Sequence, residues 1–229
     1  MHTKWSDGMN SAEEMALAAK KLGHEYICIT DHAGKLAIAH ALDEKRILEQ
    51  RKEISRLNKK LDRITILQGT EVNITEKGSL DMSDKVLKEL DIVVASIHSG
   101  FKNPKEKNTK RMTSAMENEN VDIIAHPTGR LITKRDAYEI DLDEVFKAAK
   151  KTNTIMEINS YPDRLDLKDV NVRAAVKAGV KLVISTDSHN SDQLRFIKLG
   201  IGTARRGWAT KDDVINTRSL KDMLRLLKR

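Results

Sequence analysis

The sequence has little that could cross-link the protein or anchor it in a membrane. Its 229 residues include a single cysteine, Cys28, so an internal disulfide is excluded. This cysteine lies inside an apolar segment, which favours a buried and inert thiol. No run approaches the roughly 20 apolar residues of a membrane span, and no signal peptide opens the chain. We therefore expect a cytoplasmic protein with no membrane partner.

Aromatic residues are also scarce, at 3% of the chain, so a core must consist of Ile, Val, Leu, Met and Ala. The length of 229 residues suits one barrel-sized domain and is short for two. A nucleophile elbow and a phosphate-binding P-loop are both missing, and residues 200–202 lack the third glycine of a dinucleotide-binding motif. The net charge of +7 favours a polyanionic partner such as nucleic acid.

Short apolar runs rich in β-branched residues recur along the chain and alternate with helical patterns. Strands are expected at 26–30, 64–70, 92–97, 121–125, 154–159 and 181–185, with a seventh cut short at the amino terminus. Helices are expected at about 11–22, 42–61 and 83–90, after 108, from 141, at 169–178 and from 219. Residues 72–80 are expected to form a hairpin or a loop. This alternation predicts a single α/β domain with a parallel sheet.

Five of the apolar runs end in an acidic residue or a histidine. The residues at these ends are Asp31, His32, Glu71, His98, His126, Asp187 and His189. Because the carboxyl ends of parallel strands lie along one edge of a sheet, we expect these side chains to share a rim with His2 and Asp7. His24 and His40 lie away from the strand ends, so structural or solvated roles are expected for both.

Such a rim holds more imidazole and carboxylate than a fold needs, and its carboxylates would repel one another without cations between them. Mixed nitrogen and oxygen ligands suit Zn, Mn, Fe or Co better than Mg or Ca. The candidate ligands are numerous enough for two or three ions: His2, Asp7, His32, Glu71, His98, His126, Asp187 and His189. Paired metal ions can hold a phosphoester in line for hydrolysis, so the rim predicts a hydrolase.

Six short motifs follow one another along the chain: His-Thr-x-x-Ser-Asp-Gly at 2–8, Thr-Asp-His at 30–32, Gly-Thr-Glu at 69–71, Ser-x-His-Ser at 96–99, Ala-His-Pro at 125–127 and Ser-Thr-Asp-Ser-His at 185–189. In this order they resemble the motifs of the PHP (polymerase and histidinol phosphatase) superfamily. The resemblance covers residues 1–229 and implies a distorted (β/α)7 barrel with a trinuclear metal site at the carboxyl ends of its strands. The family's first motif is His-x-His, and the chain begins inside it. We therefore expect a truncated first strand, a barrel seam short of pairing and reduced stability.

Further segments are similar to the C-terminal PHP domain of family X DNA polymerases. They lie at residues 81–82, 90–93, 110–111, 126–130, 158–161, 194–196 and 202–208. This similarity implies a Mn-dependent 3′–5′ exonuclease and phosphoesterase that acts in DNA repair. No segment resembles a polymerase palm, so the chain is expected to carry a PHP domain without a polymerase domain.

The resemblance also implies roles for individual residues. It divides the candidate ligands among three ions: His2, Glu71 and Asp187; Glu71, His98 and His126; and Asp7, His32 and His189. Asp31 is expected to orient a neighbouring group. The residues expected to take part in catalysis are Asp7, Glu71, Asp187 and His189. Rim loops also carry cations, including Arg164, and aromatic rings that suit phosphates and bases. The substrate contacts expected among them are Arg130, Lys102, Tyr161 and Arg195.

Three functions fit these observations. The leading prediction is a metal-dependent 3′–5′ exonuclease, or DNA 3′-end-processing hydrolase, that acts in repair with two or three Mn, Zn or Fe ions. The first alternative is a small-molecule phosphatase of the histidinol-phosphatase type, which would use the same rim with different loops. The second is a catalytically impaired, metal-stabilised DNA-binding module, because the first motif is incomplete. The sequence does not determine the oligomeric state.

Overall fold

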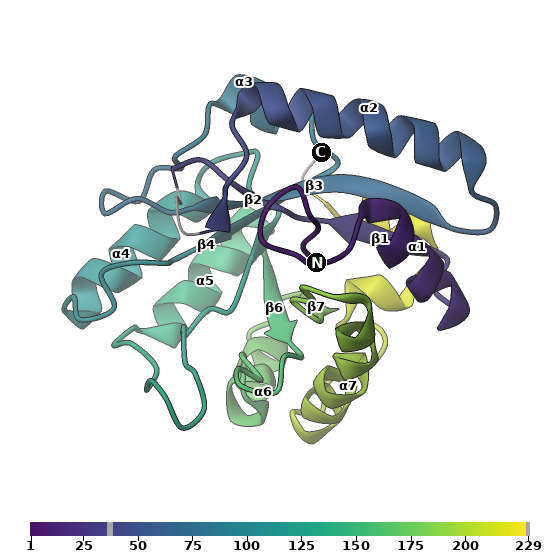
Figure 1. Cartoon of the computed structure of the whole chain (residues 1–229). Coiled ribbons are helices and arrows are strands. Elements are labelled where there is room, and N and C mark those ends of the chain that lie inside the picture. The colour runs from purple at the N-terminus through teal and green to yellow at the C-terminus, as the bar shows by residue number, and fades with distance from the viewer. Residues whose placement is uncertain (36–38, 228–229) are drawn as a thin grey trace.

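In the part of the chain that the structure describes, seven parallel strands form one curved sheet, and helices lie around its outside (Figure 1). The computed structural model describes residues 1–35 and 39–227. Its strands are β1 (Tyr26–Ile29), β2 (His32–Ala33), β3 (Thr65–Asn73), β4 (Ile92–Ser96), β5 (Ile123–Ile124), β6 (Ile155–Asn159) and β7 (Leu182–Ser185). They pair in the order β1-β3-β4-β5-β6-β7, with β2 also beside β3. The sheet curls into a half-barrel, which confirms the predicted α/β fold class.

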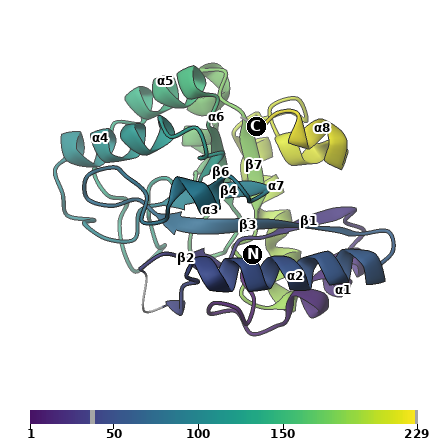
Figure 2. The ribbon, with the colours of Figure 1, turned by 90° about the horizontal axis from the view of Figure 1, so that it is seen from above.

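Helices connect successive strands. They are α1 (Ala12–Lys21), α2 (Glu44–Lys60), α3 (Asp84–Leu87), α4 (Lys105–Met116), α5 (Leu142–Thr152), α6 (Asp169–Lys177), α7 (Ile197–Arg206) and α8 (Leu220–Leu224), with 3-10 turns η2 (Ser191–Phe196) and η3 (Ile215–Thr217). Ser11 and Glu14 form the predicted capping box of α1, and Ser219 caps α8. Figure 2 shows α2 along β3 and α4 beside α5, and residues of all three helices belong to one core. Among the described helices, none is both long enough and apolar enough to cross a bilayer.

Alternate residues of β4 contribute to two of the three apolar cores that the described residues form. Val93 and Ala95 of β4 belong to the larger core, together with apolar residues of α4, α5 and β6. Ile92 and Val94 belong to a smaller core with other strand residues and with Met223 of α8. The strands are therefore apolar on both faces, as parallel strands buried between layers usually are. Polar side chains are left for the strand ends, where the rim lies.

A seam separates β1 from β7, the two outermost strands in the pairing order. The amino terminus lies in this seam (Figure 1): Thr30 N donates to the Met1 carbonyl, and His2 N donates to the Ser188 carbonyl, each at 2.8 Å. The side chain of Asn216 hydrogen-bonds to the backbone of β7 along the same edge. A cavity of about 160 Å³ lies inside the half-barrel beside the seam. β1 and β7 are therefore not paired with each other, and amino-terminal residues and Asn216 hydrogen-bond to the segments along the seam.

Several elements differ from their predicted bounds. β3 continues to Asn73, so Glu71 lies within the strand and not after it. α4 begins at Lys105, where a polar loop was expected. Residues 72–80 form the hairpin alternative, closed by an antiparallel bridge. Helix α7 was not expected, because its two glycines weaken helix propensity. Gly200 is needed there, since a Cβ at this position would overlap a side chain that follows β6.

Candidate metal centre

All eight candidate ligands meet at the rim formed by the carboxyl ends of the strands. They come from the amino-terminal loop, from β2 and β3 and from the segments that follow β4, β5 and β7: His2, Asp7, His32, Glu71, His98, His126, Asp187 and His189. Seven of them form three groups whose ligand atoms lie within 4.8 Å of one another: His2, Asp7, His32 and His189; His32, Glu71 and His98; and His2, Glu71 and Asp187. His126 lies outside these groups but contacts Glu71. The structure thus brings together side chains that are up to 187 positions apart in the sequence.

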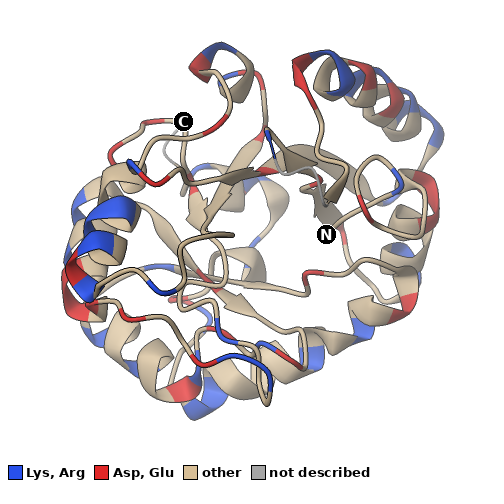
Figure 3. Ribbon diagram, turned by 60° about the vertical axis from the view of Figure 1, so that its left-hand side comes forward, with Lys and Arg blue, Asp and Glu red and all other residues tan. Residues whose placement is uncertain are grey.

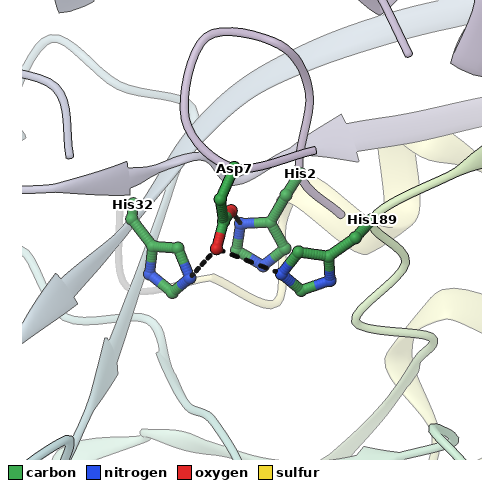
Figure 4. A group of neighbouring side chains, drawn as sticks. All are labelled: His2, Asp7, His32 and His189. Atoms are coloured by element: carbon green, nitrogen blue, oxygen red, sulfur yellow. Dashed lines mark ion pairs between the residues drawn. The ribbon is translucent and has the colours of Figure 1, made fainter. Parts of the chain in front are cut away.

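The first group surrounds Asp7, which lies in the loop after the amino terminus (Figure 4). The Asp7 carboxylate lies 3.5 Å from His189 Nε2, 3.8 Å from His32 Nε2 and 4.0 Å from His2 Nδ1. The His2 ring stacks between the other two, with centroids 4.4 Å from each. Burial would raise the pKa of Asp7, but a hydrogen bond from His189 and the nearby imidazoles lower it to about 2.

Glu71 lies at the centre of the rim and contacts imidazoles on both of its sides. Its Oε1 lies 3.0 Å from His126 Nε2 and 3.2 Å from His98 Nε2. Its Oε2 lies 3.4 Å from His2 Nε2 and 4.0 Å from His32 Nδ1. Burial opposes ionisation of this carboxyl, but the charge of His32 and hydrogen bonds from the other three rings hold its pKa well below the usual range. A single carboxylate therefore links the candidate ligands of all three groups.

Asp187 completes the third group, with His2 and Glu71. Its Oδ1 lies 3.1 Å from His2 Nε2. Its Oδ2 accepts a hydrogen bond of 3.1 Å from Asn159 Nδ2 and forms an ion pair with Arg164 Nε at 3.1 Å. Burial raises the pKa of Asp187, but the hydrogen bond and charge of His2 outweigh that effect and lower it. The Asp187 carboxylate is therefore surrounded by four side chains: His2, Glu71, Asn159 and Arg164.

The donor atoms of the rim fit divalent cations. The Nδ1 atoms of His2, His32 and His126 are buried and have no hydrogen-bond partner among the described residues. Each of the three groups offers three or four nitrogen and oxygen donors, as Zn²⁺, Mn²⁺ and similar ions require. Burial opposes a charge on His2, but the hydrogen bonds that it donates to Asp187 and Glu71 raise its pKa to about 10. A positive charge is therefore stable where the carboxylates converge.

Asp31 anchors the loop that presents His2 and Asp7. It is buried, and its carboxylate accepts four hydrogen bonds: from the backbone N and the hydroxyl of Thr3, from Ser6 Oγ and from Gln50 Nε2. These distances lie between 2.6 and 2.7 Å. Asp31 is absent from the three donor groups, which agrees with the orienting role expected from the sequence.

The expected substrate contacts have different positions. Lys102 is exposed on the loop after β4, and Tyr161 is half-buried with its ring edge-on to Phe196, at a centroid distance of 5.7 Å. Arg130 instead donates to the backbone carbonyls of residues 164 and 165, so its guanidinium holds a loop. Arg195 lines a separate surface hollow beside α1. The structure therefore does not bring Arg130 or Arg195 to the candidate ligands as free cations.

Three side chains contact the rim that the sequence reasoning did not select. Arg164 was one of several rim cations, and its position beside Asp187 depends on the loop after β6. Glu157 and Asn159 lie two positions apart near the end of β6, among apolar neighbours. This spacing places both side chains on one face of the strand, and that pattern could have revealed them.

Known proteins resemble this chain in sequence and in fold. The family model described as PHP domain matches residues 1–161. The chain belongs to the PHP domain family. The DNA polymerase/3′-5′ exonuclease PolX of Bacillus subtilis (strain 168) is 48% identical over all of this chain, which spans 40% of that relative's length. A probable phosphatase of Thermoanaerobacter sp. (strain X514) is 34% identical, over 94% of this chain and 88% of its own length.

A solved structure shares the fold of this PHP domain. Histidinol phosphate phosphatase from Lactococcus lactis subsp. lactis Il1403, complexed with zinc, L-histidinol and phosphate, matches with a TM-score of 0.69 over 92% of each chain. The two sequences are 17% identical, so this likeness shows the fold alone. The family membership places the chain among the metal-dependent phosphoester hydrolases.

Proposed function

We propose that this PHP domain hydrolyses DNA from the 3′ end, as a metal-dependent 3′–5′ exonuclease in DNA repair. The observation that carries the proposal is Glu71, whose two oxygens connect groups of imidazoles in the middle of the rim. Neighbouring ions that share a carboxylate are suited to in-line hydrolysis of a phosphodiester. The 48% identity to a protein named as a 3′-5′ exonuclease supports DNA as the substrate. The net charge of +7 suits a polyanion, and Figure 3 shows Lys and Arg on the outer helices and on several loops.

The proposed cofactors are two or three divalent ions, Mn²⁺ or Zn²⁺. The residues that would hold them are His2, Glu71 and Asp187 for one ion, Glu71, His98 and His126 for a second, and Asp7, His32 and His189 for a third. When bound, such ions polarise phosphate oxygens and lower the pKa of water. The protein's part is to hold these donors in a fixed arrangement.

Arg164 is the rim cation best placed to meet a substrate phosphate. Its Nε lies 3.1 Å from Asp187 Oδ2, and its side chain is 20% exposed. Arg130 holds the backbone of its loop through the carbonyls of Arg164 and Leu165. The guanidinium of Arg164 is thus held beside the candidate ligands before substrate arrives, which favours binding of phosphate oxygens.

Replacement of Arg164 tests this assignment. Arg164→Ala is expected to lower kcat/KM for DNA by roughly 10–100-fold, because hydrogen bonds to charged groups contribute about 1.5–3 kcal/mol. Arg195→Ala is the matched control, since Arg195 lies in the separate hollow beside α1. Equal losses in both variants would contradict a phosphate contact at Arg164.

The proposed activity can be tested with end-labelled DNA. Single strands and duplexes are incubated with Mn²⁺, with EDTA, and with the variants His189→Ala and His40→Ala. His40 is exposed and lies outside the donor groups, so its variant controls for loss of a histidine elsewhere. The proposal predicts a Mn²⁺-dependent ladder of shortened products that disappears with EDTA and with His189→Ala and remains with His40→Ala. DNA left intact by protein that binds Mn²⁺ would refute it.

A small-molecule phosphatase is the second candidate. It is supported by the probable phosphatase that this chain matches over 88% of that relative's length. Histidinol phosphate is therefore assayed beside DNA under the same conditions. Phosphate release from the small ester without DNA shortening would favour this candidate. Metal binding without turnover of either substrate would favour the binding-module alternative.

A further inference from the structure

Two candidate ligands have backbone conformations that are uncommon for residues with a Cβ. His126 has a φ of 30° and Asp187 a φ of 49°, both in the left-handed region. Each such residue costs about 1–3 kcal/mol and persists only where its surroundings hold it. Both residues follow strands that flank β6, so side chains of β6 lie between them.

Glu157 and Asn159 of β6 contact both strained residues. Glu157 Oε2 accepts a hydrogen bond of 2.5 Å from the backbone N of His126, and Glu157 Oε1 accepts one from Ser185 Oγ of β7. Asn159 Nδ2 donates to Glu157 Oε2 at 3.3 Å and to Asp187 Oδ2 at 3.1 Å. The two side chains therefore form a continuous polar connection from β5 across β6 to β7.

We propose that Glu157 and Asn159 are positioning residues that hold His126 and Asp187 in ligand geometry without binding metal themselves. This inference rests on the metal centre of the proposed function. Both side chains are buried, with exposures of 6% and 0%, and Glu157 already accepts three hydrogen bonds from protein groups. Neither residue belongs to the three groups of converging donors. Partners that orient metal ligands typically affect metal affinity by about 10–100-fold.

Two substitutions at Glu157 separate positioning from ligation. Glu157→Gln keeps an acceptor for His126 N and presents an NH₂ group that can donate to Ser185 Oγ. Glu157→Leu removes every one of these hydrogen bonds. Asn159→Ala is a second variant that removes the contact with Asp187, the link to Glu157 and the hydrogen bond that Asn159 Oδ1 accepts from Tyr161 N. Asp122→Leu is the control, because this buried carboxylate accepts a backbone hydrogen bond at the opposite end of β5.

The first measurement is amide hydrogen exchange of His126 in EDTA-treated protein, and the second is the Mn²⁺ affinity. Positioning predicts that Glu157→Leu exposes the His126 amide to exchange and weakens Mn²⁺ binding by about 10–100-fold. Glu157→Gln should resemble the wild type in both measurements, and Asn159→Ala should weaken Mn²⁺ binding. Asp122→Leu should lower the free energy of unfolding and leave the Mn²⁺ affinity unchanged.

Two outcomes would overturn the proposal. If Glu157→Gln loses as much Mn²⁺ affinity as Glu157→Leu, the negative charge is required and Glu157 acts as a ligand. If neither Glu157→Leu nor Asn159→Ala changes the affinity, the connection through β6 does not position the ligands. Neither measurement depends on turnover, so a protein that binds Mn²⁺ but leaves DNA intact would refute the proposed function alone.

Discussion

Replacement of Asp31 by asparagine tests how the amino-terminal loop is held. Asp31 Oδ1 accepts from Thr3 N and Ser6 Oγ, and Oδ2 accepts from Thr3 Oγ1 and Gln50 Nε2. The variant keeps the shape of the side chain but exchanges one oxygen for an NH₂ donor. If the NH₂ group replaces Oδ2, Thr3 Oγ1 and Gln50 Nε2 would face a donor in the variant, where the wild type offers them an acceptor.

The magnitude follows from what these donors can do instead. The Thr3 hydroxyl can rotate and accept from the new NH₂ group. Gln50 can present its oxygen only by giving up the hydrogen bond that it accepts from Gln68 Nε2 at 3.1 Å. One or two hydrogen bonds to a buried carboxylate are thus lost, at about 1.5–3 kcal/mol each. We expect the free energy of unfolding to fall by about 2–4 kcal/mol.

Urea unfolding of metal-free protein measures this loss, and a Mn²⁺ titration measures its effect on the rim. Because the loop carries His2 and Asp7, we expect Asp31→Asn to weaken Mn²⁺ binding by about 10–100-fold. Ser11→Ala is the control: it removes the cap of α1 and should cost about 1 kcal/mol without changing Mn²⁺ affinity. Wild-type stability and wild-type Mn²⁺ affinity in Asp31→Asn would refute the reasoning.

Three further predictions concern packing, thiol chemistry and protonation. In α7, a Cβ at Gly200 would overlap Ser160, so Gly200→Ala should lower the free energy of unfolding by about 1–3 kcal/mol. A Cβ at Gly202 meets nothing within 4 Å, so Gly202→Ala should raise the free energy of unfolding in the same urea assay. Burial raises the pKa of Cys28 to about 12, so a disulfide reagent should label unfolded protein and spare folded protein; rapid labelling of both would contradict this. The pKa of His2 is 6.5 in the unfolded chain and about 10 in the folded protein. Its charge therefore stabilises metal-free protein fully below pH 6.5, and this contribution is lost as the pH rises through about 10. Burial lowers the pKa of His32 to about 4, so near neutral pH His2 carries a proton and His32 does not. Binding of Mn²⁺ should therefore release a proton from His2 and none from His32, and calorimetry in buffers of different ionisation heat measures this release.

The strand ends illustrate how much of the site local sequence can predict. An apolar run followed by His98 or His126 predicts a ligand at the rim, because the direction of a parallel strand determines which end its last residue occupies. The same reasoning located Asp187, and each of these residues lies at the rim in the structure. This prediction does not depend on which strands are neighbours, since the carboxyl ends of all parallel strands share one edge.

The rim loops show where local sequence is insufficient. Arg130 and Arg164 are both cations after strand ends, and the sequence favoured Arg130. In the structure Arg130 binds two backbone carbonyls, while Arg164 contacts Asp187. Loops have no regular periodicity, so the direction of their side chains depends on contacts with distant segments. Helix α7 was missed for a related reason, because Gly200 is chosen by its packing and opposes the local helix propensity.

The sequence predicted most of the strands and helices, the caps of α1 and α8 and the set of candidate ligands. These depend on periodicity, on capping residues and on strand direction, which are properties of short segments. The contact of Arg164 with Asp187, and the connection through Glu157 and Asn159 between the ends of β5 and β7, became visible only in the folded protein. Those relations depend on contacts between side chains far apart in the chain, such as His2 with Asp187, 185 positions away, and no local pattern encodes them.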